Sequence, residues 1–271
     1  MRHVRRLATL CLAWTLLFVL GGCTGLGKAK DDHTLTIGIS FDQPGLGLKE
    51  NGTYSGFDVD VARFIGKQMG YAPDQIKFKE APTAQRENLL VGGQVDLVIA
   101  SYSITEARKQ LVDFVGPYME TGAGLLVRQD STITGVKDLE GKVVCSASGS
   151  TSSRAITQIV PSVTLREFDS FAKCVDALQN SSVDAVTSDE VILAGLAARP
   201  QSRGQVKLVG TPFTTEDYGI GLHRDDPKLC QRVRTALETM IKQGAWARAV
   251  SRNLGPSGYA TPRPPRVAAC R

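Results

Sequence analysis

From residue 34 to about residue 255, short apolar segments alternate with amphipathic ones. Leu35, Ile37 and Ile39 are separated by single polar or small residues, and this two-residue period predicts a strand. Between residues 57 and 69 the apolar positions recur every three or four residues, which predicts an amphipathic helix. The two patterns then follow each other along the chain, without an internal repeat of fixed length.

The same periods predict the remaining elements. Further strands or extended segments are predicted at 76–78, 95–100, 122–127, 142–147, 163–168, 183–187, 206–209 and 218–223. Further helices are predicted at 83–91 with Thr83 as its cap, after the capping residue Thr105, and at 151–160, 170–179, 190–198, 229–241 and 246–254. Alternating strands and helices predict an α/β protein with mostly parallel sheets. Two β/α series, joined by an extended segment near residue 122, suggest two lobes with a ligand site in the cleft between them.

The first 23 residues have a different pattern. Three arginines within the first six residues precede an apolar run from Leu7 to Leu20, and Gly21, Gly22 and Cys23 follow. This order is typical of a secretory signal peptide, and the run is shorter than the roughly 20 residues that a membrane-spanning helix needs. A cysteine after two small residues resembles the bacterial lipobox, in which the thiol is lipidated and becomes the first residue. The alternative is an ordinary secreted protein that is cleaved nearby.

We therefore expect residues 1–22 to be a lipoprotein signal peptide and residues 23–33 to be a tether. A lipid on Cys23 would then anchor the protein to the extracytoplasmic face of the cell membrane. Removal of the leader's three arginines lowers the formal net charge from +5 to +2, which gives no basic surface for nucleic acid. The hydrophobic content of 42% is sufficient for a substantial core.

Four cysteines remain in the chain after Cys11 is removed and Cys23 is lipidated. They are Cys145, Cys174, Cys230 and Cys270. An even number in an exported chain suggests disulfides, for which three connectivities are possible, whereas the spacings are not those of a metal site. Buried free thiols are the alternative.

Six motifs now carry a family resemblance. In chain order they are Gly56–Ala62 (GFDVDVA), Gly93–Val98 (GQVDLV), Ser101–Arg108 (SYSITEAR), Val112–Tyr118 (VDFVGPY), Asp138–Val144 (DLEGKVV) and Val183–Asp189 (VDAVTSD). Together they resemble the family 3 periplasmic solute-binding proteins, the polar amino-acid receptors of ABC transporters, over roughly residues 34–255. The segment Phe41–Gly47 (FDQPGLG) resembles in particular the glutamate-binding lipoproteins of actinobacteria.

This resemblance implies a type II clam-shell fold. Lobe 1 would comprise residues 34–123 and 217–255, lobe 2 would be the insertion 124–216, and residues 256–271 would form a Pro-rich tail. The resemblance also implies a monomeric receptor, without cofactor or metal, that captures an acidic or polar amino acid and delivers it to a membrane permease. L-glutamate is the expected ligand. Within this fold we expect the disulfides Cys145–Cys174 in lobe 2 and Cys230–Cys270 between lobe 1 and the tail.

The ligand's α-carboxylate is assigned to Arg108 by the resemblance. A guanidinium binds a carboxylate through two charge-assisted bonds, although Arg108 taken alone would be a surface arginine on a short helix. The resemblance also implies that Ser101 and Ser103 form hydrogen bonds with the ligand. For Ser103 the alternative is that its side chain only caps the local turn. Residues Gly149, Ser150 and Thr151 open a helix after a strand, so their free N–H groups could complete the carboxylate site from lobe 2.

Three further residues are assigned to the ligand in the same way. Asp189 would accept the ligand's ammonium, whereas the structural alternative is capping of the following helix. Arg86 would bind a side-chain carboxylate and so select acidic ligands; the alternative is a solvated ion pair with Glu87. Phe41 would form a wall beside the ligand's side chain, or else be a core aromatic.

Two other functional classes compete with the receptor. A few proteins of this fold are dehydratases, but His3 lies in the leader, His33 lies in the tether and His223 ends a strand away from the expected site. A sensor or adaptor module would normally be fused to a membrane-spanning segment. We therefore expect a binding protein and not an enzyme.

Overall fold

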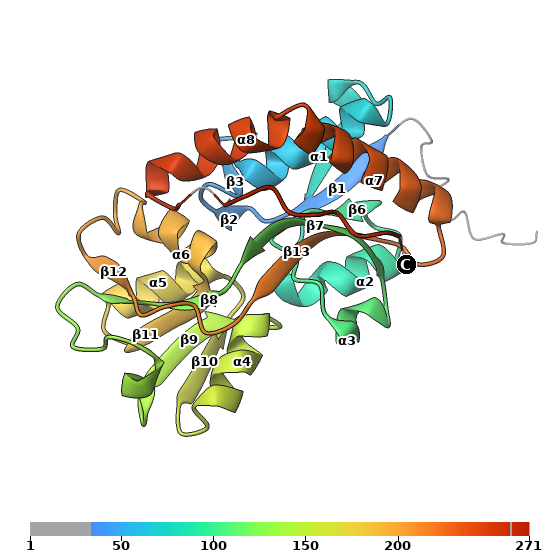
Figure 1. The fold of residues 1–271 in the computed structure, drawn as a ribbon. Helices are drawn as coiled ribbons and strands as arrows, with labels where there is room; N and C mark the ends of the chain where they lie inside the picture. Colours follow the sequence, from blue (N-terminus) through green and yellow to red (C-terminus); the bar gives the residue numbers. More distant parts are fainter. Residues whose placement is uncertain (1–33, 261, 271) are drawn as a thin grey trace, which may run out of the picture. The chain divides into compact units, whose positions relative to one another are not determined.

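Three sheets organise the chain in the computed structural model, which describes residues 34–260 and 262–270 (Figure 1). The first sheet has the order β5 (Ile76–Glu80), β1 (Leu35–Ile39), β6 (Leu97–Val98), β13 (Glu216–Leu222) and β7 (Asp113–Thr121). The second has the order β10 (Thr164–Phe168), β9 (Val143–Ala147), β11 (Ala185–Asp189), β8 (Ala123–Arg128) and β12 (Val206–Val209). A small third sheet joins β2 (Asp42–Gln43), β3 (Gly47–Glu50) and β4 (Thr53–Ser55).

Each five-stranded sheet is mixed. In the first sheet β1 runs parallel to β5 and β6, while β13 runs antiparallel to β6 and β7. In the second sheet β9 runs parallel to β10 and β11, while β8 runs antiparallel to β11 and β12. The chain passes to the second sheet at Gly122, between β7 and β8, and returns between β12 and β13. Lobe 1 is therefore built from both ends of the described chain, and lobe 2 is inserted.

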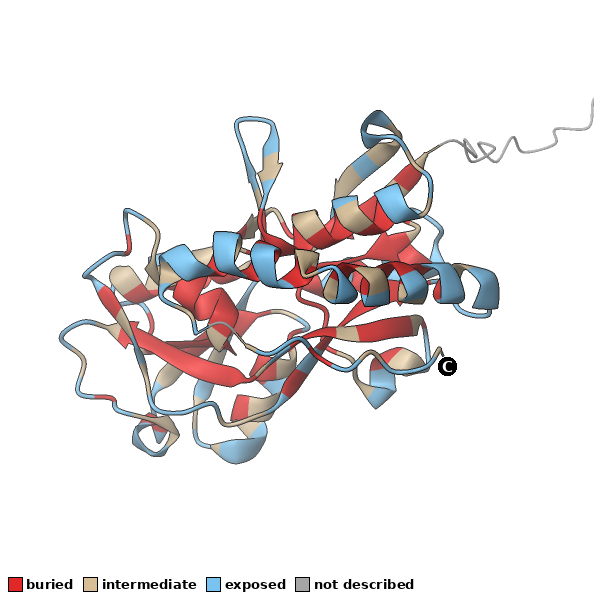
Figure 2. Ribbon diagram, turned by 45° about the horizontal axis from the view of Figure 1, so that its top comes forward, coloured by how far each residue is buried: buried red, intermediate tan, exposed pale blue. Residues whose placement is uncertain are grey.

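Helices cover the sheets. They are α1 (Phe57–Gln68), α2 (Arg86–Val91), α3 (Glu106–Lys109), α4 (Thr151–Ile159), α5 (Phe171–Gln179), α6 (Glu190–Ala197), α7 (Pro227–Lys242) and α8 (Ala245–Leu254). Short 3₁₀ turns lie at η1 (Pro73–Gln75), η2 (Thr83–Gln85), η3 (Val136–Leu139) and η4 (Gly255–Ser257). Figure 2 shows that burial follows the strands and the inner faces of the helices, as amphipathic helices on a sheet require. One apolar cluster runs through both lobes, from Leu35 in β1 to Val186 in β11.

Two disulfides lie in these lobes, with the pairing expected from the sequence. Cys145 in β9 is bonded to Cys174 in α5, which fixes that helix to the lobe 2 sheet. Cys230 in α7 is bonded to Cys270 in the Pro-rich tail. The tail is held further by a hydrogen bond from the Ala268 N–H to the Gly116 carbonyl at 2.7 Å.

Two predicted strands begin later than expected, for the same reason in both lobes. The Asp96 carboxylate accepts the Thr36 N–H at 2.9 Å, and the Asp184 carboxylate accepts the Val143 N–H at 2.9 Å. An aspartate side chain therefore replaces a backbone acceptor at the start of each strand. As a result β6 begins at Leu97 and not at residue 95, and β11 begins at Ala185 and not at residue 183. β6 ends at Val98, before the predicted residue 100, and β11 ends at Asp189, after the predicted residue 187.

Other local expectations need correction. Thr83 does not cap a helix: it begins η2, and α2 starts only at Arg86. Strand β7 was not predicted, since its sequence contains Gly116 and Pro117. Proline cannot donate a ladder hydrogen bond, but β7 is an edge strand that pairs only with β13, where proline is tolerated. The small sheet β2–β4 was also not predicted, because its strands are only two to four residues long.

The disulfides generate a prediction about stability. Replacing both Cys145 and Cys174 by alanine should lower the free energy of unfolding by about 2–4 kcal/mol, because the unfolded chain gains the freedom of an open loop. Denaturant unfolding measures the change, and the Cys230→Ala/Cys270→Ala double variant is the matched control for a bridge outside lobe 2. Peptide mapping that finds four free thiols in the unaltered protein would contradict both bridges.

Candidate functional site

Side chains from both lobes line a small cavity at the carboxyl ends of the strands, where ligands bind in α/β folds. Lobe 1 contributes Gln43, Thr83, Arg86, Ser101, Ser103 and Arg108, and lobe 2 contributes Ser150, Thr151, Ser152, Phe171, Asp189 and Ile192. The cavity measures about 10 Å³, which is room for about one water molecule. An amino acid is larger, so its entry requires the two lobes to move apart.

Arg86 is buried at the start of α2, with 3% of its surface exposed. Its Nε donates to the Ala81 carbonyl, its Nη1 to the Ser101 carbonyl and its Nη2 to the Ser40 hydroxyl, each at 3.3 Å. All three acceptors are neutral, and within the described residues no carboxylate forms an ion pair with Arg86. Burial, and then the charge of Arg108, lower the pKa of Arg86. A ligand carboxylate would relieve both effects.

The alternative expected for Arg86, a solvated ion pair with Glu87, is wrong. The Glu87 carboxylate instead accepts from Nε of Arg108 at 3.0 Å. Arg108 also donates from Nη1 to the Ser103 carbonyl at 2.8 Å, and from Nη2 across the cleft to the Gly149 carbonyl at 3.2 Å. Thr105 caps the helix that carries Arg108, as expected, by accepting the Arg108 N–H at 3.2 Å. These bonds hold the guanidinium at the cavity wall.

Asp189 ends β11 and faces the cavity from lobe 2. Its carboxylate accepts from the Tyr218 hydroxyl of lobe 1 at 2.5 Å and from the Ser152 hydroxyl at 3.5 Å. It occupies the cap position of α6 but its side chain makes no capping bond, which removes the capping alternative. Burial, and then the nearby charge of Glu216, raise the pKa of Asp189 to about 7. An ammonium group beside Asp189 would offset both effects.

Ser101 is held in an unusual backbone conformation, with φ of 49°. The buried Asp58 carboxylate stabilises this turn by accepting the Ser101 N–H at 2.9 Å and the Tyr118 hydroxyl at 2.9 Å. The Ser101 hydroxyl donates to Oε1 of Gln43 at 2.7 Å, so its oxygen can still accept a bond from a ligand. Burial raises the pKa of Asp58 to about 6.

The lobe 2 segment 149–151 meets lobe 1 directly. The Thr151 hydroxyl lies 3.4 Å from the Ser103 hydroxyl across the cleft, and the Ser150 hydroxyl caps α4 by accepting the Ser153 N–H at 3.0 Å. Gly149 does not line the cavity; it has φ of +77°, and a Cβ there would lie 3.1 Å from Cα of Ala84 in lobe 1. A side chain at position 149 would therefore hinder the approach of the lobes.

Phe41 does not line this cavity. Its ring packs against Tyr54 with centroids 5.3 Å apart and lies on the apolar core, which is the alternative expected for it. The aromatic side chain in the cavity wall is Phe171, at the start of α5. Sequence reasoning also missed Gln43, Thr83, Ser152 and Ile192 among the lining residues. Gln43 lies within the FDQPGLG segment, which could have indicated it.

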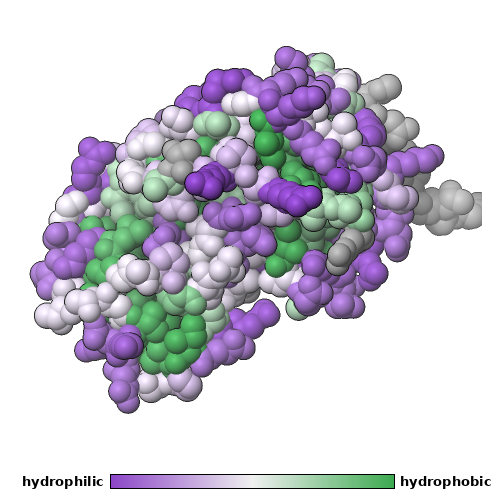
Figure 3. All heavy atoms as spheres, viewed as in Figure 1, coloured by the Kyte–Doolittle hydropathy of each residue, from purple (hydrophilic) through white to green (hydrophobic). Residues whose placement is uncertain are grey.

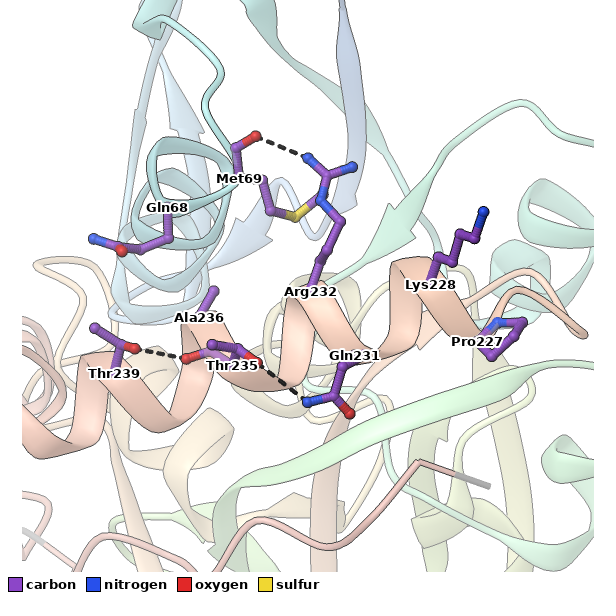
Figure 4. Close-up of a pocket in the computed structure, with 9 residues that line it drawn as sticks. All are labelled: Gln68, Met69, Pro227, Lys228, Gln231, Arg232, Thr235, Ala236 and Thr239. Atoms are coloured by element: carbon purple, nitrogen blue, oxygen red, sulfur yellow. Dashed lines mark hydrogen bonds between the residues drawn. The ribbon is translucent and has the colours of Figure 1, made fainter.

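A wider groove of about 690 Å³ lies elsewhere, between the end of α1 and α7 (Figure 4). Arg232 reaches across it and donates to the Met69 carbonyl at 2.8 Å, and Thr239 donates to the Thr235 carbonyl of its own helix. Gln231 donates to the Thr235 hydroxyl at 3.3 Å. None of the residues predicted for the ligand site lines this groove, and we assign it no ligand.

The outer surface shows no large apolar face in the view of Figure 3, where hydrophilic residues surround smaller hydrophobic areas. Within residues 34–260 and 262–270, no helix is long and apolar enough to cross a membrane. The same described residues contain no cluster of three or more His, Cys, Asp or Glu side chains that could hold a metal ion. Cys23 lies outside the described residues.

Comparisons with known proteins agree with this arrangement. The family model of the bacterial extracellular solute-binding proteins, family 3, matches residues 35–256. The glutamate-binding protein GluB of Corynebacterium efficiens is 38% identical over 274 residues, covering 93% of this chain and 92% of that protein. A solved ancestral arginine-binding protein bound to arginine has a TM-score of 0.77 at 32% identity, covering 82% of this chain and 99% of that one. An ancestral amino-acid-binding protein, described as a precursor of cyclohexadienyl dehydratase, has a TM-score of 0.74 at 28% identity, covering 82% and 95%.

The raised pKa of Asp189 predicts how stability depends on pH. Between pH 3.8 and about 7 the folded protein retains a proton that the unfolded chain has released, so this group makes stability fall as pH rises through that window. Asp189→Asn removes this titration, so the stability of the variant relative to the unaltered protein should increase from pH 4 to pH 8. The rise of the Asp189 pKa from 3.8 to about 7 corresponds to an increase of about 4 kcal/mol.

Denaturant unfolding of both proteins across this pH range measures the difference. Asp58→Asn is the matched control, because that carboxylate has a pKa of about 6 and its contribution should be lost at a lower pH. If the free-energy difference between Asp189→Asn and the unaltered protein does not change with pH, the burial argument for Asp189 is wrong.

Proposed function

The chain belongs to the bacterial extracellular solute-binding proteins of family 3, and we propose that it is an amino-acid receptor of an ABC importer whose ligand is L-glutamate or a close acidic analogue. The observation that carries the proposal is the charge of the cavity wall. Two buried guanidinium groups, Arg86 and Arg108, and one buried carboxylate, Asp189, line the same cavity. Glutamate presents two carboxylates and one ammonium, which match these groups in number and in sign.

Each charge then has a defined role. Arg108 binds the α-carboxylate, together with the N–H groups at the start of α4. Asp189 accepts the ammonium, and Arg86 binds the side-chain carboxylate. Because Arg86 and Arg108 come from lobe 1 and Asp189 from lobe 2, a single ligand bridges both lobes. Binding and lobe closure are thereby coupled.

Similarity supports the choice of glutamate. The relative that matches 93% of this chain is named a glutamate-binding protein. The ancestral precursor of a dehydratase shows that the same architecture stands close to an enzyme, but that ancestor is itself described as an amino-acid-binding protein. The receptor is therefore the better-supported function, and we propose no reaction.

We further propose that Cys23 is lipidated and anchors the receptor outside the cell membrane, from where it delivers the ligand to a permease. The basic, apolar and small-residue order of residues 1–23 supports this proposal.

Arg86 provides the test of ligand identity. Arg86→Ala should weaken glutamate binding roughly several-hundred-fold, because an uncompensated buried charge costs about 3–5 kcal/mol. Glutamine binding should change far less, because Arg86 is assigned to the side-chain carboxylate and glutamine has an amide at that position. Calorimetry with both ligands, on protein that begins at Thr24, measures the ratio of the two dissociation constants.

The controls are Arg108→Ala and Asp189→Ala, which should weaken glutamate and glutamine together because both ligands share the α-carboxylate and the ammonium. If Arg86→Ala lowers the affinity for glutamate and for glutamine equally, Arg86 is a structural residue and the main support for an acidic ligand is removed.

The anchor is tested separately. Cys23→Ala should release the protein from the membrane fraction or leave its signal peptide uncleaved, because the acceptor of the lipid is missing. Cell fractionation and intact-mass analysis measure these outcomes. An unmodified N-terminus beyond Cys23 in the native host would exclude the anchor.

A further inference from the structure

Tyr102 lies beneath both of the arginines assigned to the ligand. The guanidinium carbon of Arg108 lies 4.8 Å from the centre of the Tyr102 ring, and that of Arg86 lies 5.7 Å from it. Both distances are within the range of a cation–π contact. The Tyr102 side chain is fully buried and is not part of the cavity wall, so any effect on a ligand passes through the two arginines.

The position of this ring is tightly fixed. Ser101 and Ser103 direct their side chains to the cavity, and the intervening Tyr102 points the other way, into a separate apolar cluster. There its ring contacts Phe114, with centroids 4.8 Å apart. A Cβ at Gly221 of β13 would lie 2.7 Å from Cε1 of Tyr102, so only glycine leaves room for the ring. The ring therefore cannot move away from the guanidinium groups without disturbing β13.

Two buried guanidinium groups in one site repel each other, and each loses its hydration. Glu87 compensates Arg108 through an ion pair, whereas the acceptors of Arg86 are neutral oxygens. The face of an aromatic ring carries negative electrostatic potential and attracts a cation more strongly when water is excluded. Both arginines contact the face of the Tyr102 ring.

We propose that Tyr102 is a positioning residue that determines selectivity for dicarboxylic amino acids. Its ring contacts both guanidinium groups and holds them at a spacing that allows each to take one carboxylate of the same ligand. The inference rests on the proposed function, because it assumes that both arginines bind the ligand.

Two substitutions separate the ring face from simple packing. Tyr102→Leu removes the face and should weaken glutamate binding about tenfold or more, with a smaller loss for glutamine, which engages only Arg108 through a carboxylate. Tyr102→Phe keeps the aromatic face. It should retain the affinity for glutamate and the ratio of the glutamate affinity to the glutamine affinity. Phe114→Leu is the matched control, since it perturbs the same apolar cluster and should lower stability without changing that ratio.

Calorimetry with glutamate and glutamine gives the ratio, and thermal unfolding shows that each variant is folded. If Tyr102→Leu does not fold, a trifluorinated phenylalanine at position 102 is the replacement variant. Fluorine withdraws electrons from the ring face and changes the size of the ring little. The ratio of the glutamate affinity to the glutamine affinity should then be lower than in Tyr102→Phe. An unchanged ratio in the folded Leu variant or in the fluorinated protein overturns the inference. Failure of the unaltered protein to bind glutamate instead overturns the proposed function, and the role of Tyr102 with it.

Discussion

The structure around the cavity is governed by the cost of removing charges from water. Arg86, Arg108 and Asp189 are each at most 8% exposed, and each is held by neutral hydrogen-bond partners, by one ion pair or by the Tyr102 ring. Apart from Glu87, which pairs with Arg108, these partners stabilise a buried charge only in part, because they supply dipoles and not a full opposite charge. The lowered pKa of Arg86 and the raised pKa of Asp189 are two expressions of the same deficit. A zwitterionic ligand with a second carboxylate corrects it.

The same constraint explains why the site is divided between two lobes. If all three charged groups belonged to one rigid lobe, they would be held at fixed positions whether or not a ligand was present. Here the contacts across the cleft are local: Arg108 reaches the Gly149 carbonyl, Ser103 meets Thr151, and Tyr218 reaches Asp189. A ligand that pairs with groups on both sides adds charge-assisted bonds to these contacts. The better the ligand's charges pair with the charged groups of both lobes, the more the ligand stabilises the closed arrangement over the open one.

Much of the architecture could be predicted from the sequence, since strong two-residue and helical periods mark most strands and helices. Strand boundaries were less predictable, because Asp96 and Asp184 act as acceptors in place of the backbone and no periodicity reveals such a bond. Arg108 could be placed because a short motif carries it on a helix capped by Thr105, and Asp189 because a motif carries it to the end of a strand. Phe171 belongs to no motif and reaches the cavity only through the packing of the lobes, whereas Phe41, which the sequence predicts for the wall, packs on the apolar core.

The conformation of Ser101 links the fold to the site. A non-glycine residue with positive φ costs about 1–3 kcal/mol unless its surroundings compensate. Here Asp58 in α1 and Tyr118 in β7 both bond to the Ser101 N–H, so the helix and the edge strand together hold the turn. That turn directs the Ser101 carbonyl to Arg86 and sends Tyr102 beneath both arginines. The core of lobe 1 therefore fixes the positions of the guanidinium groups before any ligand arrives, and the ordering cost is met during folding and not during binding.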